Sequence, residues 1–135
     1  MKHDVVAITD EIYEHLVFDG LRHIPIATYP GMQDRTITIC GLGKTFAVTG
    51  WRVGYCIASA ELTDAVRKVH DFTTVCAPTP LQEAMAAVIG SPDSYYQWVP
   101  SALPLRRAEA PWSYPQSFRR STHSSIGRRA VLLIM

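Results

Sequence analysis

Residues 41–54 read GLGKTFAVTGWRVG, and this stretch says more than any other part of the 135-residue chain. Its single lysine, Lys44, directly follows Gly43 and stands among small residues. Glycine has no side chain, so the loop can be tight and a large flat group can approach the lysine amine. Arg52 follows eight positions later. This arrangement is typical of a lysine that forms a Schiff base, with an arginine nearby to bind an anion. In isolation, Lys44 could equally be an ordinary solvated surface lysine.

Two other glycine–lysine motifs can be excluded. A Walker A phosphate loop that ends at Lys44 needs a glycine at position 38, where Thr38 stands. A dinucleotide-binding fingerprint needs a third glycine at position 46, where Phe46 stands.

Upstream, residues 10–13 read DEIY and follow an apolar run at residues 5–8. Asp10 at the end of a buried strand can pair with a protonated ring nitrogen, or it can cap the following turn. Tyr13 can donate to an oxygen on the same ring, or it can be a core tyrosine with a solvated hydroxyl. Arg52 can bind a phosphate through two parallel hydrogen bonds, or it can be a surface arginine on a strand. The residues alone leave these alternatives open.

The hydrophobic pattern predicts strands over residues 5–8, 36–40 and 51–58, and helices over residues 61–72 and 81–89. The first strand is expected to be buried. Ser59 is a suitable N-cap for the first helix. Strands that alternate with helices indicate an α/β fold.

Composition excludes several other classes of protein. The formal net charge of +1 gives no support for binding to nucleic acid or to an anionic membrane. No apolar run approaches the roughly 20 residues that cross a bilayer, and no signal peptide is expected. The histidines lack metal-ligand spacing, so no metal site is predicted. The cysteines are expected to be buried free thiols in a cytoplasmic protein, namely Cys40, Cys56 and Cys76.

The pattern changes after about residue 98. The segment 101–135 has no lysine and a single acid, Glu109. It carries six arginines in three adjacent pairs: Arg106, Arg107, Arg119, Arg120, Arg128 and Arg129. A disordered basic tail and an RNA-contacting tail are both possible. Because the segment shows no helix or strand period, we favour a third interpretation, in which residues 99–135 are non-homologous sequence read out of frame.

The DEIY motif and the KTFAVTGWRVG segment, in this order and separation, resemble the class I/II aminotransferases, which are pyridoxal-phosphate enzymes of fold type I. The resemblance spans about residues 4–98, which is most of the chain. It implies an internal fragment of the large cofactor-binding domain, a partial three-layer sandwich with a mostly parallel sheet flanked by helices. It also implies that Lys44 is the Schiff-base lysine, Asp10 the partner of the pyridine nitrogen, Tyr13 the partner of the ring oxygen and Arg52 a phosphate ligand.

The expected activity is transfer of an amino group between an amino acid and a 2-oxo acid, in a homodimer whose segment 76–82 lies near the neighbour's active site. The sequence style is closest to relatives that act on aromatic or sulfur-containing amino acids. Many relatives carry a serine where Gly41 stands, so one phosphate hydrogen bond worth about 1.5–3 kcal/mol is expected to be absent. The family's first half and its small domain have no counterpart here. The alternative prediction is therefore an inactive fragment that needs a partner or the missing segments.

Overall fold

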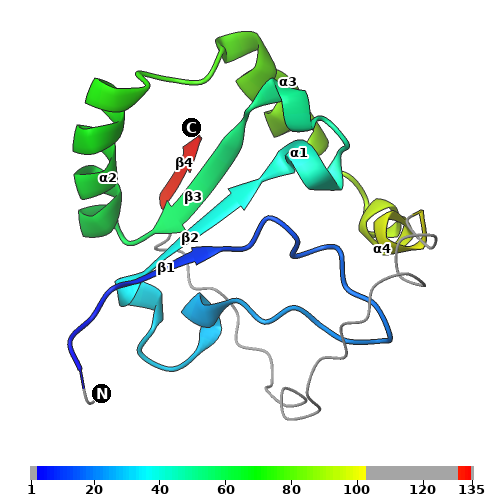
Figure 1. Cartoon of the computed structure of the whole chain (residues 1–135), viewed down its shortest axis with the longest axis horizontal. Helices are drawn as coiled ribbons and strands as arrows, with labels where there is room; N and C mark the ends of the chain where they lie inside the picture. The colour runs from blue at the N-terminus through cyan, green and yellow to red at the C-terminus, as the bar shows by residue number, and fades with distance from the viewer. Residues whose placement is uncertain (1–2, 103–130, 135) are drawn as a thin grey trace.

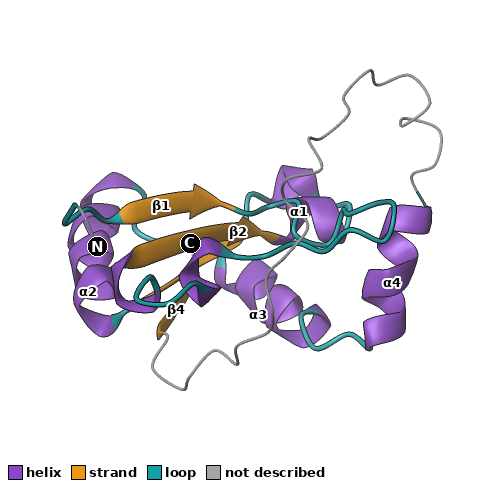
Figure 2. Ribbon diagram, turned by 90° about the horizontal axis from the view of Figure 1, so that it is seen from below, coloured by secondary structure: helices purple, strands orange, loops and turns teal. Residues whose placement is uncertain are grey.

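The computed structural model describes residues 3–102 and 131–134. A mixed sheet occupies the middle of the molecule, with α2 at one end and α4 at the other (Figures 1 and 2). The strands are β1 (Ala7–Asp10), β2 (Thr36–Gly41), β3 (Gly54–Ala58) and β4 (Val131–Ile134). The α-helices are α1 (Leu42–Thr45), α2 (Ala60–Thr73), α3 (Thr79–Val88) and α4 (Asp93–Ser101). Short 3-10 turns lie at Ile26–Thr28, Gln33–Arg35 and Thr49–Trp51.

The α/β class is confirmed, but the sheet is more antiparallel than expected. Its order is β1-β2-β3-β4. Strands β1 and β2 pair in parallel, whereas β2 with β3 and β3 with β4 pair antiparallel. The short connection between β2 and β3 carries only α1 and one 3-10 turn, which is too little for a helical crossover back into parallel register.

Helix α2 follows the sequence prediction closely. Ser59 is its N-cap, and the Ser59 side chain accepts a hydrogen bond from the Leu62 backbone N–H. Helix α3 begins two residues before its predicted start, at Thr79, because Pro80 fits the first turn of a helix. The main apolar core lies near α1 and α3 and consists of Leu42, Val53, Ala77 and Met85.

Strand β1 corrects one prediction, because it lies two residues later than expected and is not buried. Ile8 is 68% exposed, and Val5 and Val6 precede the strand and are exposed as well. The reason is topological: among the described residues β1 pairs only with β2, so its other edge is open. The cysteine prediction is also corrected in part, since Cys40 and Cys56 are buried but Cys76 is exposed.

The predicted third strand, 51–58, begins only at Gly54. Thr49–Trp51 forms a 3-10 turn, and Arg52 adopts left-handed backbone angles (φ 54°, ψ 42°) that no strand contains. The rest of the prediction for residues 99–135 falls mostly on residues 103–130, outside the described part of the chain. Two elements were nevertheless not expected: α4 continues through Ser101, and the apolar run at residues 131–134 pairs with β3 as β4.

Candidate functional site

A small hollow of about 200 Å³ lies where β1 and β2 end, and it brings together three of the four predicted site residues: Asp10, Lys44 and Arg52. Asp10 is the last residue of β1, and Lys44 belongs to the single helical turn that directly follows β2. The carboxyl ends of parallel strands are the usual place for ligands in α/β sheets. The remaining walls come from Ile12, Ile39, Cys40, Gly41, Gly43, Thr49, Val53 and Gly54.

Lys44 is held at the hollow by buried neighbours on its own turn. Leu42 and Thr45 of α1 are both buried, which leaves the half-buried Lys44 on the opposite side. The hydroxyl of Tyr95, on α4, donates to the Thr45 carbonyl at 2.9 Å. The Tyr95 ring also stacks on Phe46, with 5.1 Å between the ring centroids. The turn that carries Lys44 is thus held by its own buried side chains and by contacts with α4.

Close backbone contacts explain why glycine is needed beside Lys44. A Cβ atom at Gly43 would lie 2.9 Å from Thr49 Cα, which is backbone and cannot move aside. The Thr49 hydroxyl donates to the Gly43 carbonyl at 3.1 Å and ties the two segments together. At Gly54 a Cβ atom would lie 2.8 Å from the Cys40 carbonyl oxygen. These contacts leave no room for a Cβ atom at either position.

Arg52 reaches the hollow through an unusual backbone conformation. Its φ of 54° is left-handed, a region that costs a non-glycine residue about 1–2 kcal/mol. Its guanidinium Nη1 donates to the Thr49 carbonyl at 3.4 Å, a long bond on an exposed side chain. No carboxylate of the described residues forms a salt bridge with Arg52, so its positive charge is not neutralised there.

Asp10 makes the capping contact that the sequence allowed, and its pairing with a ring nitrogen stays a prediction. Its Oδ1 accepts a hydrogen bond from the Ile12 backbone N–H at 3.2 Å, so it caps the turn that follows β1. It also lines the hollow together with Lys44. Tyr13 differs from the other three residues, because it is 58% exposed and does not line the hollow.

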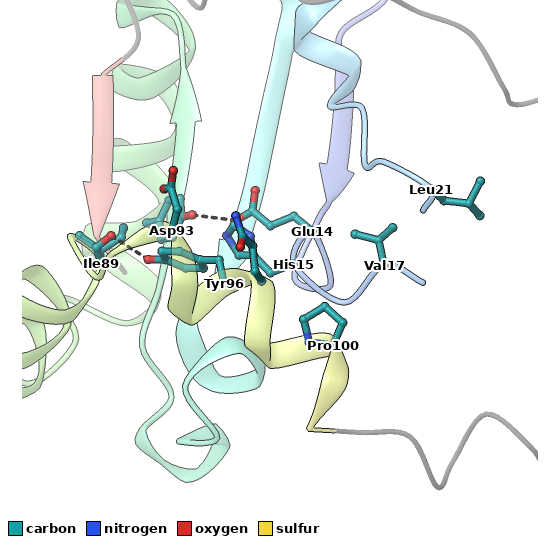
Figure 3. A pocket seen from close by; sticks show the side chains of 10 residues that line it. Glu14, His15, Val17, Leu21, Ile89, Asp93, Tyr96 and Pro100 are labelled. Carbon is teal, nitrogen blue, oxygen red and sulfur yellow. Dashed lines mark hydrogen bonds and ion pairs between the residues drawn. The ribbon is translucent and has the colours of Figure 1, made fainter. Parts of the chain in front are cut away.

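A second, larger hollow of about 680 Å³ contains none of the predicted site residues (Figure 3). Tyr55 and Glu14 meet there, with the Tyr55 hydroxyl donating to Glu14 Oε1 at 3.1 Å. Burial, followed by the Glu14 carboxylate, raises the pKa of Tyr55 well above its usual range. The His15 and Tyr96 rings lie against each other, with centroids 4.4 Å apart. No complementary set of charges suggests a ligand here.

Sequence reasoning missed several residues that support the small hollow. Glu11 is buried and makes an ion pair with His23, with 2.7 Å between Oε2 and Nε2. Strand alternation gave a signal for Glu11, since the residue after an outward Asp10 should point to the other face. Thr49 and Tyr95 act through contacts that no local pattern reveals.

Two searches for other kinds of site were negative within the described residues. Residues 3–102 and 131–134 contain no group of three or more metal-binding side chains suited to hold an ion. Over the same residues, no helix is both long and apolar enough to cross a bilayer.

An amine, a carboxylate and a guanidinium thus lie around one hollow of an α/β sheet. Comparison with known proteins identifies the family. The family model for aminotransferase class I and II matches residues 1–106, so the chain belongs to that family. The family's enzymes use pyridoxal phosphate, as the sequence predicted.

The chain is also similar to individual transaminases. It is 42% identical over 113 residues to rat (Rattus norvegicus) kynurenine–oxoglutarate transaminase 1, covering 78% of this chain and 27% of that protein. It is 44% identical over 90 residues to the kynurenine–oxoglutarate transaminase of Dictyostelium discoideum, covering 67% of this chain and 21% of the relative.

Solved structures agree with these relatives. The N-succinyldiaminopimelate aminotransferase of Mycobacterium tuberculosis matches with a TM-score of 0.72 and 40% identity, over 77% of this chain and 27% of that one. An Escherichia coli protein with methionine aminotransferase function also matches with a TM-score of 0.72, at 34% identity, over 79% of this chain and 28% of that one. The chain thus spans about a quarter of the length of the proteins that it matches.

Proposed function

We propose that this chain carries the cofactor-binding centre of an aminotransferase, which moves an amino group between an amino acid and a 2-oxo acid with pyridoxal phosphate bound to Lys44. The observation that supports this most directly is the hollow that gathers Lys44, Asp10 and Arg52. Each of the three offers a group that one part of the cofactor requires: an amine for the aldehyde, a carboxylate for the ring nitrogen and a guanidinium for the phosphate.

The hollow's own geometry fits such a group. A flat ring beside Lys44 needs walls without side chains, and Gly43 and Gly54 provide them through backbone contacts too close for a Cβ atom. At Gly41 a Cβ atom would lie 2.9 Å from Ile12 Cδ1. The Ile12 side chain thus fills the space that a serine side chain would occupy in many relatives.

When bound, the cofactor supplies an electron sink for the charge that develops at the substrate Cα. Lys44 would hold the cofactor covalently, and its amine would move a proton at the substrate Cα. Asp10 keeps a proton on the ring nitrogen through its negative charge. Arg52 binds the phosphate and fixes the position of the ring. Tyr13 is proposed as the partner of the ring oxygen by family resemblance alone, because its side chain lies outside the hollow.

The finer assignments are also proposals. Two relatives that the chain matches, from rat and human, are named kynurenine–oxoglutarate transaminases, which supports an aromatic amino donor and a 2-oxo acid acceptor. A homodimer is proposed for the full-length protein. The three free cysteines support a cytoplasmic location.

A specific observation favours a second candidate, an inactive fragment that requires a partner. Large apolar side chains are exposed on two elements, with Ile8 on β1 68% exposed and Phe72 on α2 93% exposed. Exposed apolar surface of this kind marks interaction sites or a tendency to aggregate. We expect no turnover by the isolated chain, a prediction that conversion of any amino acid and 2-oxo acid pair would overturn.

The division of the chain at residue 98 also remains a proposal, and it can be tested on the gene. Translation of the other two frames beyond the codon for Trp98 should restore an amphipathic helix and further aminotransferase-like sequence. If neither frame does so, the frameshift interpretation is wrong.

The deciding experiment is the visible absorption spectrum of the purified chain with pyridoxal phosphate, compared with Lys44→Ala. We expect a band in the wild type that borohydride fixes covalently on Lys44 and that the variant lacks. Lys68→Ala, at an exposed lysine of α2, is the matched control and should keep the band. Identical spectra for the wild type and Lys44→Ala would show that Lys44 has no cofactor role in this chain and would favour the inactive fragment.

A further inference from the structure

Glu11 is the one buried charged residue among residues 3–102. Its side chain is 5% exposed, although the preceding residue, Asp10, is exposed at the hollow. A buried carboxylate is unfavourable unless charged or polar partners compensate for its lost hydration. The partners of Glu11 therefore indicate what the residue does.

Each oxygen of the Glu11 carboxylate has its own partner. The Thr9 hydroxyl donates to Oε1 at 2.8 Å, and His23 Nε2 lies 2.7 Å from Oε2. The Glu11 backbone N–H donates to the Ile39 carbonyl at 2.8 Å, which extends the pairing of β1 with β2 by one residue. Glu11 is thus held through both its side chain and its backbone.

The consequence for Asp10 follows from strand geometry. Consecutive side chains on a strand point to opposite faces, so Asp10 faces the hollow because Glu11 faces away from it. A slip of one residue would exchange the two carboxylates between the faces. The contacts of Glu11 with Thr9 and His23 oppose such a slip.

We propose that Glu11, held by Thr9 and His23, is a positioning residue that keeps the Asp10 carboxylate directed into the hollow. Glu11 touches neither cofactor nor substrate in this role. The role of Asp10 as a cofactor ligand rests on the proposed function. The orientation of its carboxylate does not, because it can be measured without any ligand.

The ligand-free test uses the backbone amide of Ile12, which donates to Asp10 Oδ1 and so reports the position of that carboxylate. In the full chain, the NMR shift of this amide should change when Asp10→Ala removes the acceptor, and the size of that change is the amplitude of the test. When Asp10→Ala is made in the His23→Ala or the Glu11→Gln chain, we expect an amplitude at least about twofold smaller, since a hydrogen bond weakens steeply with misalignment. His23→Ala is the safer variant for folding, because the His23 side chain is 31% exposed.

A second measurement uses the affinity for pyridoxal phosphate, followed by the Lys44-dependent band. We expect the apparent Kd to rise about tenfold in both variants, since small misplacements of a binding group are costly. His23→Gln keeps a side-chain N–H donor and should restore both signals in part. Glu83→Gln, at an exposed glutamate of α3, is the matched control and should behave as the wild type.

Two outcomes would overturn the proposal. In one, the Ile12 amplitude is unchanged in both variants. In the other, the amplitude falls only together with the signals of α2 and the unfolding midpoint, which would make Glu11 a general stabilising residue. If the wild type shows no Lys44-dependent band, the proposed function fails, while the Ile12 amide still decides whether Glu11 positions Asp10.

Discussion

Two hollows formed by the described residues are built in different ways, and the smaller one is the proposed cofactor site. The hollow at Lys44 measures about 200 Å³ and draws most of its walls from residues 39–54. The hollow at Tyr55 measures about 680 Å³ and joins residues far apart in the chain, such as Glu14 and Tyr96. Three complementary functional groups meet only in the first. Volume alone is therefore a poor guide to the site in this protein.

The difference extends to the kind of contact that shapes each hollow. Around Lys44 two segments of backbone approach each other closely, at Gly43 and Thr49. Around Tyr55 they are side-chain contacts, such as the bond from the Tyr55 hydroxyl to Glu14. Replacing a glycine of the first hollow by alanine, which adds a single methyl group, should therefore weaken cofactor binding. Removing a side-chain group at the second hollow should lower the free energy of unfolding and leave cofactor binding unchanged.

The largest effect is expected from Gly43→Ala. The new methyl group meets Thr49 Cα at 2.9 Å and must push apart the two segments that flank Lys44. Pyridoxal phosphate affinity should fall at least about 100-fold, because misplacement by about 1 Å has effects of this size. The free energy of unfolding should fall by about 1–3 kcal/mol from overpacking. Absorbance titration and denaturant unfolding measure the two quantities.

Gly50→Ala is the matched control for this prediction. It lies in the same segment, but its Cβ atom would meet nothing within 4 Å. The control should bind the cofactor as the wild type does. If Gly43→Ala binds as well as Gly50→Ala, the backbone contact does not shape the site.

A smaller effect, with opposite signs for binding and stability, is expected from Arg52→Gly. Loss of a charge-assisted contact to the phosphate should reduce affinity by about 10–100-fold, which corresponds to about 1.5–3 kcal/mol. Glycine relieves the left-handed backbone at φ 54°, so unfolding should require about 1 kcal/mol more. Titration with pyridoxal phosphate and urea unfolding test both parts.

Pyridoxal without its phosphate provides the control for Arg52. It should bind the wild type and Arg52→Gly equally, because the guanidinium has no phosphate to hold. An equal loss for pyridoxal and for pyridoxal phosphate would mean that Arg52 shapes the hollow and does not bind the anion.

The contrast between the hollows also explains what the sequence could predict. Lys44 and Arg52 lie in one short segment whose glycines and spacing are visible in the sequence, and Asp10 ends an apolar run. All three line the small hollow, and their roles there stay predictions. Helix α2 was predictable for the same local reason, through its period and the Ser59 cap.

Features that depend on distant contacts could not be predicted. The support from Tyr95 spans 50 residues of sequence, and the bond between Tyr55 and Glu14 spans 41. The exposure of Ile8 depends on which strand lies beside β1, which a local run of apolar residues cannot show. Arg52 has left-handed backbone angles although its neighbours in the sequence favour a strand, so the predicted strand began too early.

At the larger hollow, Tyr55→Phe should change stability and leave binding unchanged. Removing the hydroxyl breaks its bond to Glu14, which should lower the free energy of unfolding by about 1–2 kcal/mol. The affinity for pyridoxal phosphate should stay within about twofold of the wild type, since the changed group lies outside the small hollow. Tyr96→Phe removes an exposed bond to the Ile89 carbonyl and should cost less. A loss of cofactor affinity in Tyr55→Phe would show that the two hollows are coupled.

The last prediction is a dependence of stability on alkaline pH, which arises between the hollows where Cys40 lies opposite Tyr55 in the pairing of β2 with β3. Burial, followed by the Glu14 charge, raises the pKa of the Cys40 thiol from 9.0 to about 12. The folded chain therefore holds this proton more tightly than the unfolded chain does. The resulting stability is intact below about pH 9 and is lost as the pH rises towards about 12.

Unfolding measured from pH 7 to 11 should show a shallower decline of stability in Cys40→Ala than in the wild type. Cys76→Ala, at an exposed thiol, should follow the wild type. Equal slopes for Cys40→Ala and Cys76→Ala would show that the Cys40 thiol titrates alike in the folded and unfolded chains, and that this edge of the small hollow is open to water.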